Sequence, residues 1–258
     1  MTVHEFGVDN EEVIVLIHPS LVKWDYYEYV IPLLEKDFHL IIPALPGYDD
    51  ETQDDFTSVE VITLSIENYL LMHDISTVAC LYGCSLGGAI VLKLLANNRI
   101  NSEHAIIDGG ITPYQLPYLL TRLIACRDFL MIAMGKLGGL KLLEKALAMD
   151  EYTDEDLQYM ADMMKIISYR TIWRTFDSCN NYSMPETIET SCRDIAYWYS
   201  DQETKAREWD INYMKKHLPK TRFVINVELG HGGMALLRAD DMAKRIVQMI
   251  RKGDTSND

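Results

Sequence analysis

The sequence has few cysteines, and their spacing fits neither a disulfide framework nor a metal site. Five cysteines occur in 258 residues, and no two of them form a Cys-x-x-Cys pair. Disulfide-stapled domains and zinc sites require an even number or close clusters of cysteine. The pattern is typical of reduced thiols in the cytoplasm, and we expect no metal.

Positive charge and long apolar runs are also scarce. The chain has 24 Lys and Arg against 39 Asp and Glu, which gives a formal net charge of −15. Because nucleic acid is a polyanion, it is not an expected partner. No apolar run approaches the ~18 residues of a membrane span, and residues 1–10 lack the basic and apolar regions of a signal peptide. We therefore expect a cytoplasmic monomer or homodimer that binds a small molecule and no membrane.

Short apolar runs alternate with helical patterns in the first 110 residues. The expected strands are residues 13–17, 40–45, 77–81 and 104–107. The helical patterns between them cover residues 24–34, 58–72 and 89–96. The alternation resumes after Pro185, with strands at 195–199 and 221–227 and helices at 203–217 and 240–251. Buried strands that alternate with helices predict an α/β fold, in which a mostly parallel sheet has helices on both faces.

The segment between these two halves contains helical patterns only. Residues 111–184 are rich in Leu, Met and Tyr and show no convincing strand. We expect them to form an all-helical cap inserted into a core of residues 1–110 and 185–258. The cap would lie over the carboxyl edge of the sheet, where open α/β sheets bind ligands, and its residues would contact the substrate. Its methionines either line an acyl pocket or pack the cap against itself: Met131, Met134, Met149, Met160, Met163 and Met164.

The segment Gly83-Cys84-Ser85-Leu86-Gly87 follows one expected strand and precedes a helix. Strand, Gly-x-Ser-x-Gly and helix together are the context of a nucleophile elbow, a sharp turn that exposes the serine hydroxyl. The glycines remove the Cβ atoms that would collide in such a turn. Ser85 is thus the candidate nucleophile, and the N–H of Leu86 is a candidate oxyanion donor. Cys84 is expected to be a small buried residue.

A serine nucleophile requires a base, and the base requires an acid that orients it. His231 lies between glycines in Leu229-Gly230-His231-Gly232-Gly233, directly after the last expected strand. The order serine, acid, histidine along the chain is the one expected for a serine on an elbow. The loop after strand 195–199 offers two acids, Asp201 and Glu203, and Asp108 at the end of an earlier strand is a third candidate.

These features resemble the α/β-hydrolase fold family, across essentially the whole chain outside the expected cap. In that family the acid commonly occupies the fourth position of a Gly-x-x-Asp/Glu turn. Ser200 stands in the glycine position here, so the resemblance implies that Glu203 is the acid. Asp201 is the second choice and is more typical of a helix cap.

The resemblance also implies a second oxyanion donor. Family members usually carry His-Gly after the first of these strands, and the next residue donates its backbone N–H. By this match Ser20 is the donor, although Pro19 replaces the glycine. Proline has no N–H and restricts its own φ to about −65°. His18 itself is expected to bond to neighbouring backbone.

The implied activity is that of a carboxylesterase-like serine hydrolase, which needs no metal or organic cofactor. Ser85 would attack the carbonyl of a small to medium acyl ester and form an acyl-enzyme, while His231 transfers the protons. The sequence leaves four alternative functions open. Three are enzymes with the same triad, namely a C–C bond hydrolase, a thioesterase and an acyltransferase, and the fourth is a non-catalytic ligand-binding member of the fold.

Overall fold

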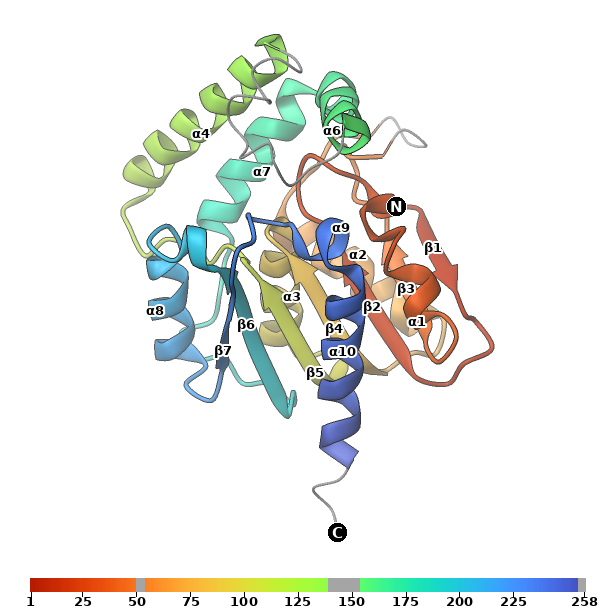
Figure 1. The fold of residues 1–258 in the computed structure, drawn as a ribbon. Helices are drawn as coiled ribbons and strands as arrows, with labels where there is room; N and C mark the ends of the chain where they lie inside the picture. The colour runs from red at the N-terminus through yellow and green to blue at the C-terminus, as the bar shows by residue number, and fades with distance from the viewer. Residues whose placement is uncertain (50–53, 139–153, 255–258) are drawn as a thin grey trace.

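In the computed structural model, which describes residues 1–49, 54–138 and 154–254, the strands form a single sheet (Figure 1). Within these residues the sheet has seven strands in the order β1-β3-β2-β4-β5-β6-β7. Only the pairing of β1 with β3 is antiparallel, and the other pairings are parallel. The strand bounds are β1 Val3–Phe6, β2 Val13–Ile17, β3 His39–Pro43, β4 Thr77–Cys84, β5 Asn101–Asp108, β6 Asp194–Ser200 and β7 Arg222–Asn226. The predicted mostly parallel α/β sheet is confirmed.

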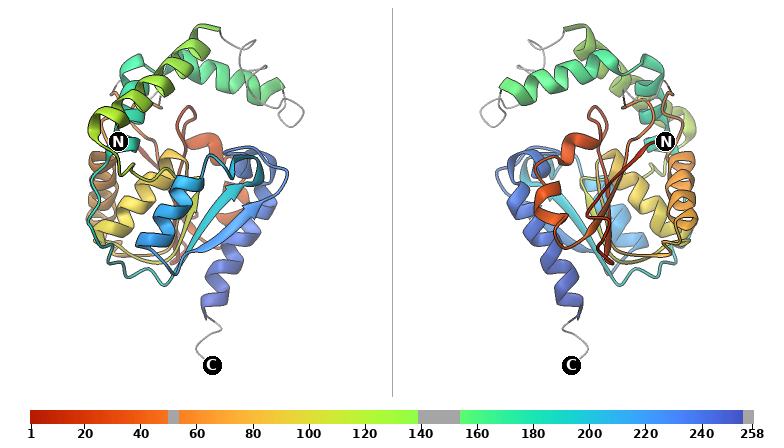
Figure 2. Two further views of the ribbon diagram at one scale, coloured as in Figure 1. Left: turned by 90° about the vertical axis from the view of Figure 1, so that its left-hand side faces the viewer. Right: turned by 90° about the vertical axis from the view of Figure 1, so that its right-hand side faces the viewer.

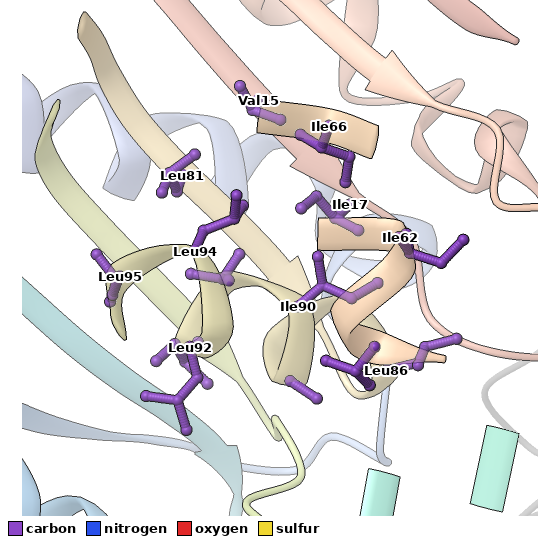
Figure 3. Close-up of a cluster of buried hydrophobic side chains, with 14 of the residues drawn as sticks. Val15, Ile17, Ile62, Ile66, Leu81, Leu86, Ile90, Leu92, Leu94 and Leu95 are labelled. Carbon is purple, nitrogen blue, oxygen red and sulfur yellow. The ribbon is translucent and has the colours of Figure 1, made fainter. Parts of the chain in front are cut away.

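Helices cover both faces of the sheet, as the sequence predicts (Figure 2). Their bounds are η1 Trp24–Tyr27, α1 Ile31–Leu34, α2 Val59–Met72, α3 Leu86–Asn97, α4 Tyr118–Gly138, α6 Asp154–Ile166, α7 Tyr169–Asn181, η3 Asp201–Glu203, α8 Glu208–His217, α9 Met234–Leu237 and α10 Ala239–Asp254. Strand β2 shows how the two layers arise, since alternate side chains point to opposite faces. Val15 and Ile17 pack with α2 and α3 (Figure 3), whereas Ile14 and Leu16 pack with α1 and α10.

Three local features differ from the predictions. Strand β1 was not predicted, because a short edge strand with His4 and Glu5 forms no apolar run. The expected helix 24–34 is two short helices, η1 and α1, since Pro32 has no N–H and would collide with the carbonyl of Glu28 in a continuous helix. The expected helix 203–217 begins later, at Glu208, after the single turn η3.

The described helices between β5 and β6 are α4, α6 and α7, and the described residues of 111–184 contain no strand. Both views in Figure 2 place these helices together beyond the carboxyl ends of the strands. Helix α7 joins them to the core, since Thr171 Oγ1 accepts a hydrogen bond from the N–H of Phe56 at 3.1 Å. This position agrees with an inserted cap, whose exact boundaries stay a prediction.

The described residues contain neither a membrane-spanning helix nor a metal-binding cluster. None of the helices in these residues combines the length and the apolar character needed to cross a membrane. The same residues hold no cluster of three or more His, Cys, Asp or Glu side chains suited to a metal ion.

Candidate active site

Ser85 occupies a strained turn between β4 and α3. Its φ is 51° and its ψ is −110°, a conformation that L-residues rarely adopt. A Cβ at Gly83 would collide with the carbonyl of Gly87, and a Cβ at Gly87 would collide with the carbonyl of Ile17. The Ser85 N–H donates to the carbonyl of Asp108 at 2.8 Å. The turn therefore has the strain and the close backbone approach expected of a nucleophile elbow.

His231 lies in the loop between β7 and α9, and its side chain contacts Glu203. Its Nδ1 is 2.7 Å from Glu203 Oε2, and 41% of its side chain is exposed. The ring packs against Gly109, where an added Cβ would lie 2.8 Å from His231 Cε1. Gly109 has a φ of 55°, so glycine is favoured there by both backbone and space. This leaves Nε2 as the ring nitrogen able to exchange a proton with another group.

Glu203 is held by contacts to both of its carboxylate oxygens. Oε1 accepts a hydrogen bond from the N–H of Ser200 at 3.0 Å. Oε2 contacts His231 and also lies 3.3 Å from Arg207 Nε. Burial alone would raise the pKa of Glu203, but His231, the Ser200 N–H and Arg207 outweigh it, and the pKa lies below its usual value. The carboxylate therefore stays ionised beside the imidazole.

The other two candidate acids bond elsewhere. Asp201 is exposed, and its carboxylate accepts hydrogen bonds from the N–H groups of Gln202 and Glu228 at 2.9 and 3.2 Å. Asp108 is buried and accepts a hydrogen bond from the hydroxyl of Tyr82 at 2.6 Å. Burial raises the pKa of Asp108 to about 6, even though that hydrogen bond and the charge of His231 oppose the shift. Of the three carboxylates, Glu203 is the one in contact with His231.

The loop after β2 presents Ser20 to the site. The buried ring of His18 accepts a hydrogen bond from the N–H of Leu45 at Nε2, at 3.1 Å. Nδ1 must then carry the proton, and it donates to the carbonyl of Pro19 at 2.8 Å. Burial lowers the pKa of His18 to about 4, which keeps the ring neutral. The peptide bond between Pro19 and Ser20 is trans. The Ser20 N–H therefore points in the opposite direction from the Pro19 carbonyl.

Proline at position 19 is compatible with this arrangement, because only its carbonyl is used. Leu86 is the first residue of α3, so its N–H has no acceptor within the helix. The two predicted oxyanion donors are thus a helix N-terminal N–H, that of Leu86, and a loop N–H directed away from the Pro19 carbonyl, that of Ser20. Cys84 is buried, as expected.

Ser85, His231 and Ser20 line a common cavity of about 200 Å³. Among the described residues, its lining contains no Lys, Arg, Asp or Glu and consists of Pro19, Ser20, Leu21, Val22, Tyr26, Ser85, Met160, Met164, His231, Gly232 and Leu236. A larger hollow of about 650 Å³, between the starts of β6 and β7 and the end of α10, contains none of the candidate catalytic residues. Ser85 and His231 therefore share one small, largely apolar chamber.

The methionines of the inserted helices divide between the two predicted roles. Met160 and Met164 of α6 line the cavity, whereas Met163 is buried in the core cluster around α2 and α3. Met131 and Met134 on α4 are exposed, so they serve neither role. Met149 lies outside the described residues.

The comparison with protein families decides the classification. A family model described as the alpha/beta hydrolase family matches residues 14–245. The chain belongs to this family. A search of curated proteins finds no match.

Solved structures of alpha/beta hydrolases share the fold at low sequence identity. MenH from S. aureus is 18% identical with a TM-score of 0.76, and the match covers 97% of each chain. A hydrolase from Oleispira antarctica is 16% identical with the same TM-score of 0.76, over 96% of this chain and 94% of its own. A carboxylesterase of Nitrososphaera gargenis is 16% identical with a TM-score of 0.72, over 98% and 95%. At these identities the likeness concerns the fold and does not extend to the reaction.

Several residues near the site of this alpha/beta hydrolase were not predicted from the sequence. Arg207 contacts Glu203, and the hydroxyl of Tyr26 donates to the carbonyl of Gly232 at 2.6 Å. Gly109 makes room for the histidine ring. Arg207 follows Glu203 by one helical turn, which is a usable signal for an ion pair. Tyr26 and Gly232 are 206 residues apart, and no local pattern connects them.

Proposed function

We propose that this protein is a serine hydrolase that cleaves a short, uncharged acyl ester through an acyl-enzyme. One observation carries the proposal: a strained serine and an imidazole line the same cavity, and Nδ1 of that imidazole contacts a partly buried carboxylate. Ser85, His231 and Glu203 come from three separate loops at the carboxyl ends of β4, β7 and β6. A nucleophile, a base and an orienting acid in this relation are the requirement for acyl transfer.

The proposed reaction begins when His231 Nε2 removes the proton of the Ser85 hydroxyl. Oγ attacks the ester carbonyl, and the oxyanion accepts hydrogen bonds from the N–H groups of Leu86 and Ser20. The protonated imidazole, paired with Glu203, then gives its proton to the departing alkoxide. His231 next deprotonates a water molecule that attacks the acyl-enzyme, and collapse of the second intermediate releases the acid and restores Ser85.

The cavity limits the substrate that can bind. At roughly 30 Å³ for each non-hydrogen atom, a figure taken from the volume of a water molecule, about 200 Å³ holds around seven atoms. An acyl chain of about four to six carbons fits this volume. A charged acyl group is disfavoured because the lining residues that the structure describes include no Lys or Arg, and burial of an unpaired charge is costly.

Helices α4, α6 and α7 belong in this proposal as the cap. Met160 and Met164 place α6 over the cavity, and the neighbouring Tyr159 ties α6 to the core. The Tyr159 hydroxyl donates to Asp25 Oδ1 at 2.6 Å and accepts from the N–H of Lys23 at 3.1 Å. Such a cover would exclude water from the acyl-enzyme until the alcohol has left.

The test is hydrolysis of p-nitrophenyl esters from two to twelve carbons by the purified protein. We expect kcat/KM to be highest at four to six carbons and to fall for longer chains. Ser85→Ala should remove the activity and the covalent labelling by a fluorophosphonate probe. Absence of labelling in the intact protein, or labelling that persists in Ser85→Ala, would refute the proposal. Thioesters and added alcohol acceptors, tested alongside, separate ester hydrolysis from thioesterase and acyltransferase activity.

A further inference from the structure

Ser200 stands at the junction of the two loops that carry Glu203 and His231. It is the last residue of β6 and is buried. Its hydroxyl accepts a hydrogen bond from the N–H of Gln202 at 3.1 Å, inside the turn that holds Glu203. The same hydroxyl donates a hydrogen bond to the carbonyl of Leu229, two residues before His231. One side chain therefore joins the acid turn to the histidine loop.

The backbone at this position does not require the glycine that the family usually has. Ser200 has a φ of −76° and a ψ of 146°, which any residue can adopt. Its own N–H donates to Glu203 Oε1, and this contact would form with any residue other than proline. The contribution specific to serine is thus the hydroxyl alone.

The histidine loop depends on few contacts of this kind. Glycines flank His231 on both sides, so the backbone has little intrinsic stiffness there. The contacts nearest His231, beyond its ion pair with Glu203, are the Ser200 bond to Leu229 on one side and the Tyr26 bond to Gly232 on the other. Farther back, Glu228 is held by Asp201 and Arg238. Loss of the Ser200 bond would leave the carbonyl of Leu229 without its side-chain partner and loosen the loop between Glu228 and His231.

We propose that Ser200 is a positioning residue whose hydroxyl holds His231 against Glu203 by tying the acid turn to the histidine loop. The inference rests on the proposed function, because it assigns Ser200 a role in the same triad. Misplacement of a catalytic group by about 1 Å can cost on the order of 10²-fold in rate. Since the Ser200 hydroxyl does not line the cavity, the effect should fall on kcat and leave KM nearly unchanged.

The kinetic test compares three variants of Ser200 with a matched control. Ser200→Ala and Ser200→Gly remove the hydroxyl, and we expect kcat to fall about tenfold or more; Ser200→Thr keeps a hydroxyl and should restore most of it. Ser102→Ala is the control, because the buried Ser102 hydroxyl also donates to a backbone carbonyl, that of His104 at 2.6 Å, near the opposite end of β5. It should lose comparable stability and keep its kcat. Equal kcat values in Ser200→Ala and the wild type would overturn the proposal.

A second measurement does not depend on hydrolysis. The proton on His231 Nδ1, bonded to Glu203, should give a low-field ¹H NMR signal, assigned by its disappearance in His231→Gln. We expect this signal in the wild type and in Ser102→Ala, and its broadening or loss in Ser200→Ala and Ser200→Gly. An unchanged signal in both Ser200 variants would contradict the positioning role. Failure of the proposed function would appear separately, as wild-type protein with the signal and no activity dependent on Ser85.

If removal of the hydroxyl prevents folding, Ser200→Cys provides the same two readouts. Cysteine has the same branching as serine, with a larger atom in place of the oxygen, and its S–H is a weaker hydrogen-bond donor. We expect an intermediate loss of kcat and a broadened signal in this variant. Wild-type values for both would reject the proposal.

Discussion

The serine and the histidine of the candidate site are held in place by different forces. Ser85 is fixed by steric crowding, since the backbone around Gly83 and Gly87 leaves no space for a side chain. His231 lies in a partly exposed loop and is held by an ion pair with Glu203 and by hydrogen bonds to the neighbouring carbonyls. A single added Cβ at the elbow would prevent the turn from forming, whereas the hydrogen bonds of the histidine loop can be removed one at a time. We therefore expect all-or-none effects at the elbow and graded effects at the histidine loop.

The largest effect is expected for Gly87→Ala. The new Cβ would collide with the carbonyl of Ile17 in β2, and backbone on both sides would have to move. We expect no folded protein, or a loss of at least about 3 kcal/mol in the free energy of unfolding, measured with urea. Gly135→Ala on α4 is the control, since its Cβ would lie 3.1 Å from the flexible end of Met164 and alanine favours helices. A Gly87→Ala protein of normal stability would contradict the steric account.

The next largest effect separates the two candidate acids. Glu203→Gln removes the charge beside His231 and replaces an acceptor that both His231 and Arg207 contact. We expect kcat for a p-nitrophenyl ester to fall by about 10²-fold or more. Asp201→Asn changes an exposed side chain bonded to backbone N–H groups and should stay within a few-fold of the wild type. The reverse order of losses would show that Asp201 is the acid.

A pH-dependent effect of intermediate size is expected at Asp108, beside the elbow. Its pKa is raised by burial from 3.8 to about 6 in the folded protein. A carboxyl whose folded pKa lies above its unfolded pKa stabilises the protein below pH 4, and this stabilisation is lost as the pH rises through 6. Relative to the wild type, Asp108→Asn should therefore gain up to about 3 kcal/mol between pH 4 and pH 8 in urea unfolding. Parallel stability curves for the two proteins would show that the carboxyl is not desolvated.

The smallest effect is expected for Tyr26→Phe, which removes one anchor of the histidine loop. Loss of its hydrogen bond to Gly232 should cost about 1 kcal/mol of stability and a several-fold decrease in kcat. Tyr27→Phe is the matched control, because the neighbouring hydroxyl of Tyr27 donates to the carbonyl of Ile17 at 2.8 Å and does not contact the histidine loop. A similar loss of stability with unchanged kcat is expected there. Equal kcat losses in the two variants would remove the case for a specific anchor.

The central strands could be predicted from the sequence because each is an apolar run bounded by polar or glycine residues. The elbow could be predicted because its crowding demands glycine at two fixed positions, Gly83 and Gly87. Strand β1 could not, because an edge strand buries too little to need an apolar pattern. The break before α1 follows from Pro32, a signal that the predicted helix 24–34 overlooked.

The contacts around the candidate triad were harder to predict than the candidate residues themselves. Ser200 was recognised only as a departure from the family pattern, and its link to Leu229 spans 29 residues. The contact between Tyr26 and Gly232 depends on the packing of η1 below the histidine loop. Such pairings follow from the assembled fold, and no short stretch of sequence contains them. The catalytic roles of Ser85, His231 and Glu203 stay predictions until the variants are measured.

The cavity wall also bears on what happens after the reaction. Hydrolysis would convert a neutral ester into a carboxylate inside a cavity whose described lining includes methionine, leucine and tyrosine and no lysine or arginine that could retain an anion. The chain as a whole has a net charge of −15, which repels an anion further. The acid should therefore leave quickly, and inhibition by accumulated product should be weak.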